Sequence, residues 1–389
     1  MTKVSKKYYV FLIVFLGMLS AFGPFVTDMY LPTLPSMAKI FNTSASLVQL
    51  GLAASMLGLA VGQIFFGPLS DKYGRKAVLV AAMVLFVVST LVSIYSPTIE
   101  FFNICRFLQG LGGSGGIVLS RSIATDCYSG RELAKTLAVI GAINGIAPVT
   151  APVIGGLVSE AVGWQGIFWI LFGIGALILV MCLIFRESHP HDNRFKGTLA
   201  SLMANLPKVF RLKYFTICVL MYAFCCGVLF SYISSAAFII QSYYGFSELM
   251  FSLFFAVNAL GIGIGSGLSL KFKKMSSAAL FGTIGITVAG ILQFCAYHLF
   301  DTFVIYEGLT FLMLVAIGFI LTSSTAIAMD EGREMVGTAS AVFGAAGFLF
   351  GGIVTPLVSI GNIMTTTILI IILCSVCSLA FAVLCFRRR

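Results

Sequence analysis

An aspartate, Asp28, closes the first long apolar run of this chain. Residues 8–27 carry no charged side chain, and about twenty apolar residues are enough to span a bilayer as a helix. The carboxylate either caps this segment in water or lies in a membrane cavity, where it can bind and release a proton. A helix that crosses the membrane from residue 8 has its negative dipole end near Asp28, so a carboxylate is not a favourable cap there. The position therefore favours a proton-binding group.

An arginine, Arg106, lies in another apolar run, at residues 99–125. Placing arginine at the bilayer centre costs about 2.5–3.5 kcal/mol, so one that is kept there usually faces a cavity and a partner. The alternative is a side chain that reaches the membrane surface, because Arg106 lies near the start of its run. The affinity of a carboxylate for a proton depends on water access and on nearby positive charge. Asp28 and Arg106 are therefore candidate proton-coupling residues.

The composition of the chain indicates that lipid covers most of its surface. Of its 389 residues, 59% are hydrophobic and 10% are charged, and the mean hydropathy is +1.05. Soluble domains carry about 25% charged residues. The net charge of +10 sits in short gaps between apolar runs and not on one face, which argues against a nucleic-acid-binding protein. The first apolar run is long and no clear cleavage site follows it, so we expect a retained helix and no signal peptide.

Twelve apolar segments are long enough to cross a bilayer as helices, and they are too long and too uniformly apolar for the strands of a barrel. The fold class that we expect is an all-α membrane protein. A polar stretch separates two sets of six segments, so we expect an N-terminal half at 1–185, a linker at 186–213 and a C-terminal half at 214–389. The segments lie at about residues 8–31, 45–69, 77–96, 99–125, 134–159, 163–185, 214–240, 247–270, 277–298, 302–328, 334–358 and 361–386.

Lysines and arginines predict the orientation of these segments. If the N-terminus lies inside, the inner loops and both termini hold 21 of the 24 basic residues, and the outer loops hold only Lys39. Basic residues prefer the cytoplasmic side, so we expect both termini and the linker to be cytoplasmic. In this topology Asp28 and Arg106 both lie in the outer half of the membrane, where they could approach each other.

The two halves are related in sequence. GRELAKT at 130–136 returns as GREMVGT at 332–338, and each opens a glycine-rich segment at the same place in its set of six. GPLSDKYG at 67–74 corresponds to GLSLKFKK at 267–274, which keeps the glycine and the basic character but not the aspartate. The halves are therefore parallel copies, and transporters built from such repeats bind substrate near the membrane midplane, between the copies.

The stretch GPLSDKYGRK, at 67–76 between the second and third segments, resembles the cytoplasmic loop signature of the major facilitator superfamily. Its glycines permit a tight turn and a close approach of helices. Its aspartate can pair with basic residues or with the positive end of a neighbouring helix. The resemblance implies a loop that latches the inner gate when the transporter faces outward; the alternative is an ordinary polar loop. The gating residues would be Gly67, Asp71, Gly74 and Arg75.

Two further stretches resemble motifs of the same superfamily. RFLQG at 106–110 is similar to the motif in which a buried arginine accompanies proton coupling. APVTAPVIGG at 147–156 resembles the motif that marks antiporters, although two of its usual glycines are alanines here. Prolines and paired glycines allow a bend and close helix packing, so this stretch is either a hinge or a simple packing face. The residues concerned are Pro148, Pro152, Gly155 and Gly156.

TDMYLPTLP at 27–35, FSYISSAAFIIQSYYGFS at 230–247 and FAVNALGIGIGSG at 255–267 resemble one branch of the superfamily, the Bcr/CflA-type multidrug efflux transporters. The resemblance implies a secondary transporter of a bacterial inner membrane that exports amphipathic drugs, such as bicyclomycin and chloramphenicol, in exchange for protons. Some relatives have a second acidic residue two turns before Asp28, where this chain has Ser20. Alternatives are a metabolite exporter or importer of the same fold, a membrane receptor or scaffold, and a channel.

Aromatic and polar residues mark where the substrate cavity is expected. An aromatic, mostly apolar cavity suits hydrophobic molecules of varied shape. Glu307 is either a second titrating group or an interfacial carboxylate. The candidate cavity residues are Tyr30, Asn144, Tyr222, Tyr232 and Asn258.

Several classes of activity are not expected. The chain has no G-x-x-x-x-G-K-[ST] loop, so we expect no ATP-driven transport. No His/Cys or carboxylate cluster has metal-ligand spacing, and no nucleophile–base pair stands out, so we expect neither an enzyme nor a bound cofactor or metal. Most of the ten cysteines lie inside apolar segments, where they act as small hydrophobic residues. The expected partners are a small-molecule substrate, protons and the lipid bilayer, and a monomer suffices.

Overall fold

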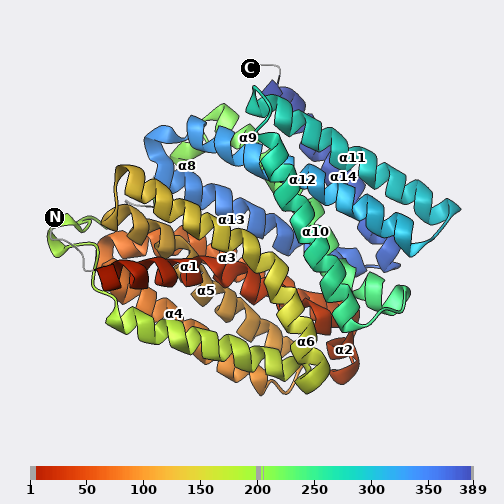
Figure 1. Ribbon diagram of the computed structural model, residues 1–389, viewed down its shortest axis with the longest axis horizontal. Coiled ribbons are helices and arrows are strands. Elements are labelled where there is room, and N and C mark those ends of the chain that lie inside the picture. Colours follow the sequence, from red (N-terminus) through yellow and green to blue (C-terminus); the bar gives the residue numbers. More distant parts are fainter. Residues whose placement is uncertain (1–5, 199–202, 205, 387–389) are drawn as a thin grey trace.

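The computed structural model describes residues 6–198, 203–204 and 206–386, and all regular elements within these ranges are helical. Figure 1 shows them as two bundles, the N-terminal one below and the C-terminal one above. The first bundle contains α1 (Lys6–Asp28), η1 (Leu31–Thr33), α2 (Leu34–Ile40), α3 (Ala45–Tyr73), α4 (Arg75–Ile94), α5 (Ile99–Cys127) and α6 (Gly130–Ile184). After η2 (His191–Asn193) and α8 (Leu206–Val209), the second contains α9 (Lys213–Ala237), the π-helical turn η3 (Phe238–Tyr243), α10 (Glu248–Ser269), α11 (Met275–Leu299), α12 (Phe303–Glu331), η4 (Arg333–Met335), α13 (Val336–Val354), η5 (Thr355–Ser359) and α14 (Ile363–Phe386).

Twelve long helices account for the predicted spans. Ten segments of the described residues are long and apolar enough to cross a membrane. One of these, α6, contains two spans, because Gly163 has a φ of 72° and interrupts the helix. The twelfth, α5, is a 29-residue helix that contains many glycines and two arginines, which lower its hydropathy. The predicted all-α membrane fold of twelve spans is confirmed.

The signature stretch at 67–76 is more helical than the sequence suggests. We expected a loop there, but α3 continues to Tyr73 and α4 starts at Arg75. Only Gly74 separates the two helices, and its φ of 96° is a conformation that L side chains rarely adopt. Lys72 near the end of α3 also suits the negative end of the helix dipole, which favours the extension.

Equivalent helix pairs pack in the same way in both halves. In the first half α3 lies against α5 so closely that a Cβ on Gly110 would overlap the carbonyl of Ser55. In the second half α10 and α12 pack likewise, and a Cβ on Gly318 would overlap the carbonyl of Ile262. Small residues let membrane helices approach in this way without a hydrophobic driving force. The packing therefore repeats the internal symmetry that the sequence indicates.

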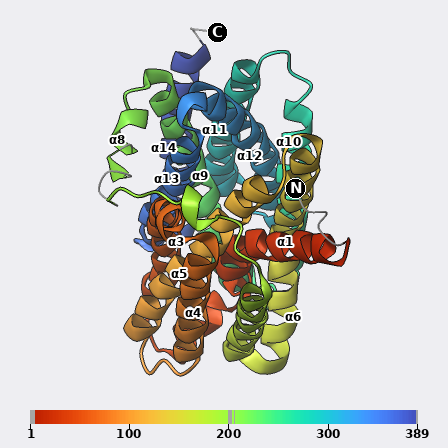
Figure 2. The ribbon, with the colours of Figure 1, turned by 90° about the vertical axis from the view of Figure 1, so that its left-hand side faces the viewer.

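The halves meet along two helix pairs. α3 packs against α13, and α6 packs against α10. Figure 2 shows the two halves as separate bundles when the molecule is turned by 90°. We call the end of the molecule that carries the basic residues of segments 72–76, 131–135 and 271–274 the basic end. The site is built from residues between the halves.

Candidate functional site

A cavity of about 430 Å³ lies between the two halves. It is lined by α1 and α6 of the first half and by α9, α10, α12 and α13 of the second. This volume is in the range of pockets that bind drug-sized molecules. Among its described lining residues Asp28 is the only charged one, and Phe230, Phe255 and Phe348 give it an aromatic, apolar character. The arrangement suits an amphipathic molecule and one exchangeable charge.

Asp28 is the last residue of α1 and is only 6% exposed. The hydroxyl of Thr27 donates a hydrogen bond of 2.7 Å to its Oδ1. The same hydroxyl lies 3.0 Å from the carbonyl of Gly23, one turn earlier in the helix. Both Thr27 and Asp28 line the cavity. The carboxylate is thus held by its own helix and faces the space between the halves.

Arg106 is fully buried in α5. Its Nη2 donates to the carbonyl oxygen of Val26 at 2.7 Å and to Oγ of Ser55 at 3.2 Å, and its Nη1 donates to Oε1 of Gln109. The guanidinium also lies over the ring of Tyr30, 4.2 Å from its centroid. The Val26 carbonyl is one of the last four of α1, which have no partner inside the helix. A cation is favourable at this negative helix end.

Arg106 and Asp28 therefore meet at the same end of α1 without pairing directly. The ion pairs among the described residues do not include these two side chains. Arg106 contacts the backbone two residues before Asp28, so it fixes the helix end that carries the carboxylate. Its other support is Gln109, whose Nε2 donates to Thr90 Oγ1 at 2.7 Å. Sequence reasoning missed Gln109, although its spacing of three residues from Arg106 places both on one helix face.

The five candidate cavity residues lie in different parts of the structure. Tyr232 lines the cavity. Asn258 lies behind it and donates to the Tyr232 hydroxyl at 2.9 Å. Tyr30 is buried beneath Arg106, and Tyr222 stacks on Phe343 in another part of the second half, so neither lines the cavity. The side chain of Asn144 in α6 lies outside the described residues.

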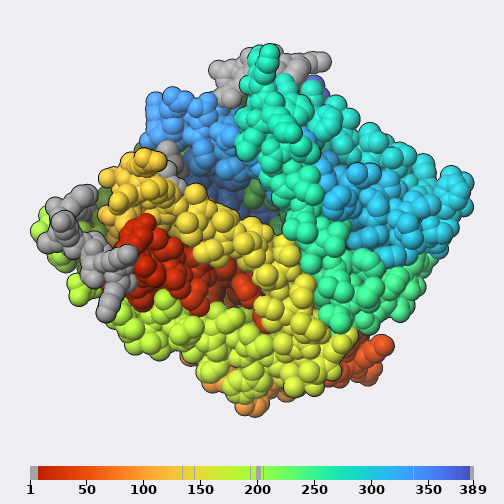
Figure 3. Space-filling model, in the orientation of Figure 1, coloured from red at the N-terminus to blue at the C-terminus, as the bar shows by residue number. Residues whose placement is uncertain are grey.

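A second hollow, of about 760 Å³, lies at the basic end. The first half contributes Gly67, Asp71, Arg75 and Arg121, and the second contributes residues around Glu334. Figure 3 shows the surface hollowed between α6 (yellow) and the C-terminal half (blue and teal). The cleft between the halves is therefore open at the basic end.

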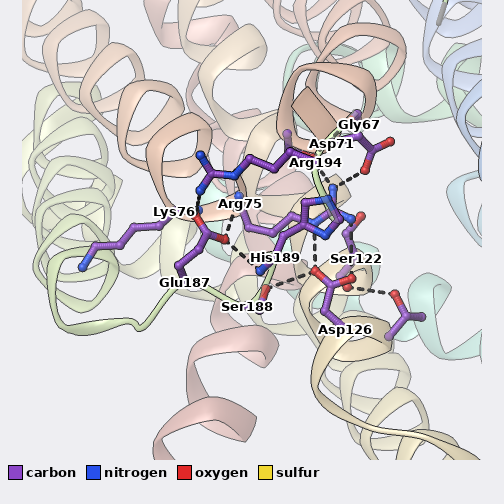
Figure 4. Close-up of polar contacts among 12 residues, drawn as sticks. Gly67, Asp71, Arg75, Lys76, Ser122, Asp126, Glu187, Ser188, His189 and Arg194 are labelled. Carbon is purple, nitrogen blue, oxygen red and sulfur yellow. Dashed lines mark hydrogen bonds and ion pairs between the residues drawn. The ribbon is translucent and has the colours of Figure 1, made fainter. Parts of the chain in front are cut away.

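Figure 4 shows three of the four candidate gating residues, Gly67, Asp71 and Arg75, in a cluster of polar contacts. The fourth, Gly74, separates α3 from α4 beside this cluster. Arg75 donates to Asp71 at 2.5 Å and to Asp126 of α5 at 2.9 Å, and its guanidinium also contacts Ser70 at 2.6 Å. The cluster ties the ends of α3, α4 and α5 together. Sequence reasoning did not identify Asp126, because nothing in its local pattern points to a partner in another helix.

The linker adds a third carboxylate to this cluster, after Asp71 and Asp126. Glu187 accepts hydrogen bonds from the backbone N–H groups of Arg75, at 3.0 Å, and Lys76, at 3.2 Å. These groups belong to the first turn of α4, where a negative charge is favourable. Arg194 of the linker pairs with Glu187 at 3.5 Å, and the N–H of Phe195 donates to the Asp71 carbonyl at 2.9 Å. The start of the linker is thus docked on the first half.

The end opposite the basic end is closed by hydrogen bonds between the halves. Gln49 of α3 is fully buried there; its Nε2 donates to the Ser234 carbonyl at 2.9 Å, and its Oε1 accepts from Ser359 at 2.6 Å. Gln241 donates to the Pro32 carbonyl at 2.8 Å. Further contacts join Ser159 with Glu248 and Glu160 with the N–H of Leu249.

The motif at 147–156 joins both halves through α6. Pro148 lines the cavity. A Cβ on Gly155 would overlap the carbonyl oxygen of Met29, just after α1, and one on Gly156 would overlap the side chain of Ser252 on α10. Pro152 lies between these points, inside the helix. Gly155 thus allows α6 to approach the backbone just after Asp28, and Gly156 allows α6 to approach α10 of the second half.

Replacing Gly155 with Ala is expected to destabilise the protein. The new methyl group would overlap a backbone carbonyl, and such overpacking costs about 1–3 kcal/mol. Thermal unfolding of the purified protein should begin at a lower temperature. Gly141→Ala is the matched control, because a Cβ at Gly141 of the same helix would meet nothing within 4 Å. Equal unfolding of both variants would contradict the close contact at Gly155.

Comparison with known proteins places this geometry in a family. A family model described as "Major Facilitator Superfamily" matches residues 10–356. The MFS-type transporter YdgK of Bacillus subtilis is 37% identical over 357 residues, which cover 89% of this chain and 88% of the relative. A bicyclomycin resistance protein homolog of Haemophilus influenzae is 28% identical, over 91% of this chain and 90% of the relative. A chloramphenicol resistance protein of Pseudomonas aeruginosa is 29% identical, over 86% of this chain and 80% of the relative.

A solved structure has the same fold. It is that of a bacterial homolog of the human lysosomal transporter Spinster, with a TM-score of 0.79 at 16% sequence identity. The match covers 99% of this chain and 98% of that chain. This chain therefore shares its overall fold of two helical halves with that structure.

Proposed function

The chain belongs to the major facilitator superfamily, and we propose that it is a proton-coupled antiporter that exports amphipathic drugs by alternating access. The observation that carries this proposal is a mostly apolar cavity between the halves, in which Asp28 is the only charged residue among the described lining residues. A carboxylate there can bind a proton or, when ionised, attract a polar substrate. If a substrate and a proton compete for this residue, the inward flow of protons can drive substrates out.

The open and closed ends of the cleft support alternating access. The described structure has a hollow at the basic end and hydrogen bonds between the halves at the other end. By the distribution of lysines and arginines, the basic end is cytoplasmic. The structure then represents a state in which substrate enters from the cytoplasm. In the opposite state the Gln49 contacts would open and the gating cluster around Arg75 would close against the second half.

The substrate class is inferred from the cavity and from the relatives. The aromatic lining suits hydrophobic molecules, and two relatives are named for resistance to bicyclomycin or chloramphenicol. We infer that this chain exports molecules of similar size and polarity from a bacterial cell, through the inner membrane, with both termini in the cytoplasm. A single copy contains the whole cavity, so a monomer suffices.

Proton leakage from inside-out vesicles tests the proposal. The vesicles hold an acidic interior, and chloramphenicol, ethidium or another candidate drug is added outside. Wild-type protein should release protons from the vesicles when an exported drug is present. An energised, active protein that moves a drug without releasing protons would contradict antiport. Proton release by a metabolite, and by none of the drugs, would instead identify a metabolite transporter of the same fold.

Replacing Gln49 with Leu is expected to favour the state that is open at the opposite end. The change removes two hydrogen bonds across the closed end, each worth about 0.5–1.5 kcal/mol, so the population ratio should shift about tenfold. The distance between spin labels on Asn42 and Asn362, which are exposed at that end on different halves, measures the shift.

The matched control for this measurement is Gln165→Leu, because Gln165 is exposed. The labels are placed in a protein that lacks the exposed Cys295 and the partly exposed Cys127 and Cys377, so that labelling is directed to the chosen sites. Identical distance distributions for wild type and Gln49→Leu would show that Gln49 does not hold the closed end.

A further inference from the structure

Glu307 is an acidic residue of the second half that the proposed exchange does not use. It lies on α12, and its Oε1 accepts a hydrogen bond of 2.7 Å from Nδ2 of Asn258 on α10. The same nitrogen donates to the hydroxyl oxygen of Tyr232 on α9, at 2.9 Å. Tyr232 lines the cavity, as Asp28 does. A chain of three side chains therefore leads from Glu307 to the wall of the substrate cavity.

Two oxygen atoms of the hydrogen-bonded group Glu307–Asn258–Tyr232 have no hydrogen-bond donor. Oε2 of Glu307 and Oδ1 of Asn258 are both buried and have no hydrogen-bond partner, and Asn258 is only 1% exposed. The ion pairs among the described residues include none with Glu307. A buried acceptor without a donor is costly, and an unpaired buried charge is more so. A proton on the Glu307 carboxyl group would remove the charge, and on Oε1 it would make Glu307 a hydrogen-bond donor toward Asn258.

Other titratable groups near Glu307 do not supply that donor. Tyr232 faces it from α9, and Tyr306 is its neighbour on α12. Tyr297 of α11 and Tyr244 line a small pocket with Tyr306, and the Tyr244 hydroxyl donates to Asp301. Asp28 lies across the cavity and brings no positive charge. The groups named here thus offer hydroxyl groups and carboxylates, and no ion pair among the described residues holds Glu307 ionised.

We propose that Glu307 is a second proton-binding residue, and that Asn258 transmits its protonation to Tyr232 in the cavity wall. This inference deepens the proposed antiport and rests on it for its role in transport. The ligand of the new site is a proton. Through Tyr232, the site would act on substrates that carry a hydrogen-bond acceptor.

A rotation of the Asn258 side-chain amide can transmit the protonation state of Glu307 to the Tyr232 hydroxyl. The amide oxygen and nitrogen have similar positions, so a rotation of 180° exchanges acceptor and donor. When Glu307 is ionised, Asn258 donates to both Glu307 and Tyr232, which leaves the Tyr232 proton free to bind a substrate acceptor. When Glu307 is protonated, its O–H donates to Asn258 Oδ1, and the Tyr232 hydroxyl donates to the same oxygen. Proton binding at Glu307 therefore removes a donor from the cavity, and substrate binding favours release of that proton.

Infrared difference spectra between acidic and alkaline pH test this site without a substrate. If the acidic pH is kept above about 6, where exposed carboxyl groups are already ionised, the full-length protein in proteoliposomes should show two carboxylic acid C=O bands that change with pH. Glu307→Gln should remove one of these bands and Asp28→Asn the other. Glu100→Gln is the matched control, because Glu100 is exposed in the first turn of α5, and it should leave both bands unchanged. The tyrosine C–O band that Tyr232→Phe removes should shift with pH in the wild type and not in Glu307→Gln.

Asn258→Leu separates the two parts of the proposal. It leaves Glu307 and Tyr232 in place, so the Glu307 band should persist while the Tyr232 band no longer shifts with pH. Absence of a band that depends on Glu307 would overturn the site, and a Tyr232 shift that survives in Asn258→Leu would overturn the transmission. A missing Asp28 band would contradict only the proposed antiport through Asp28 and would leave the Glu307 site unaffected. The two proposals can therefore fail separately.

Discussion

Replacing Asp28 with Asn is expected to abolish substrate-induced proton release from inside-out vesicles, with a loss of at least about tenfold. Asparagine has nearly the same shape as aspartate, so the cavity and the contact with Thr27 can remain. It cannot take up a proton at physiological pH. Without Asp28, a substrate meets no proton to displace among the described residues that line the cavity. The measurement is the rate of proton leakage after a drug is added, relative to wild type at equal expression.

Asp192→Asn is the matched control, because Asp192 is an exposed linker residue far from the cavity lining. It should keep wild-type proton release. If Asp28→Asn still couples drug and proton movement, Asp28 is not the carrier, and Glu307 becomes the first residue to replace. Binding of the drug to Asp28→Asn, measured without a proton gradient, separates lost coupling from a collapsed cavity.

Replacing Arg106 with Ala is expected to lower the stability of the protein by about 3–5 kcal/mol. The Val26 carbonyl and the Gln109 amide oxygen would lose their donor, and each unpaired buried acceptor costs about 1–3 kcal/mol. The truncation also leaves a cavity beside Tyr30, which adds to the loss. Thermal or denaturant unfolding of the purified protein measures the change.

Arg121→Ala provides the comparison on the same helix, since Arg121 is exposed in the hollow at the basic end. Its stability should stay close to that of the wild type. A small effect of Arg106→Ala would favour a side chain that reaches the membrane surface over the buried one described here. Arg106→Lys is informative as well, because lysine keeps the charge but lacks the planar fork that contacts Val26, Ser55 and Gln109 together.

The helices were predictable from the sequence because a bilayer restricts the chain to long apolar helices. The internal repeat was also readable from residue type and spacing, and the boundary predicted between segments 134–159 and 163–185 lies at the break at Gly163. The extension of α3 to Tyr73 was not, because a polar, glycine-bounded stretch has the composition of a loop. Helix dipole and tertiary packing decided that boundary.

Contacts within the candidate site were less predictable than the residues that form it. The sequence singled out Arg106, but its main acceptor is a backbone carbonyl, and every residue has one. Asp126 and Glu187 escaped notice because their partners lie on other helices and are brought together only by the fold. Asn258 and Glu307 were both noted as polar residues at depth, yet their direct hydrogen bond is a property of the packed helices.

The docking of Glu187 and Phe195 on the first half has a mechanical consequence. If the halves rock as rigid bodies, the chain up to Phe195 must travel with the N-terminal body, because it is fastened to α3 and α4. The part of the linker that accommodates the relative motion of the halves then begins after Phe195. It is shorter than the whole linker at 186–213. Changes of length before that residue would pull on the signature segment. Changes between Phe195 and α8, whose Val209 is buried in the core of the second half, would alter the reach between the two moving bodies.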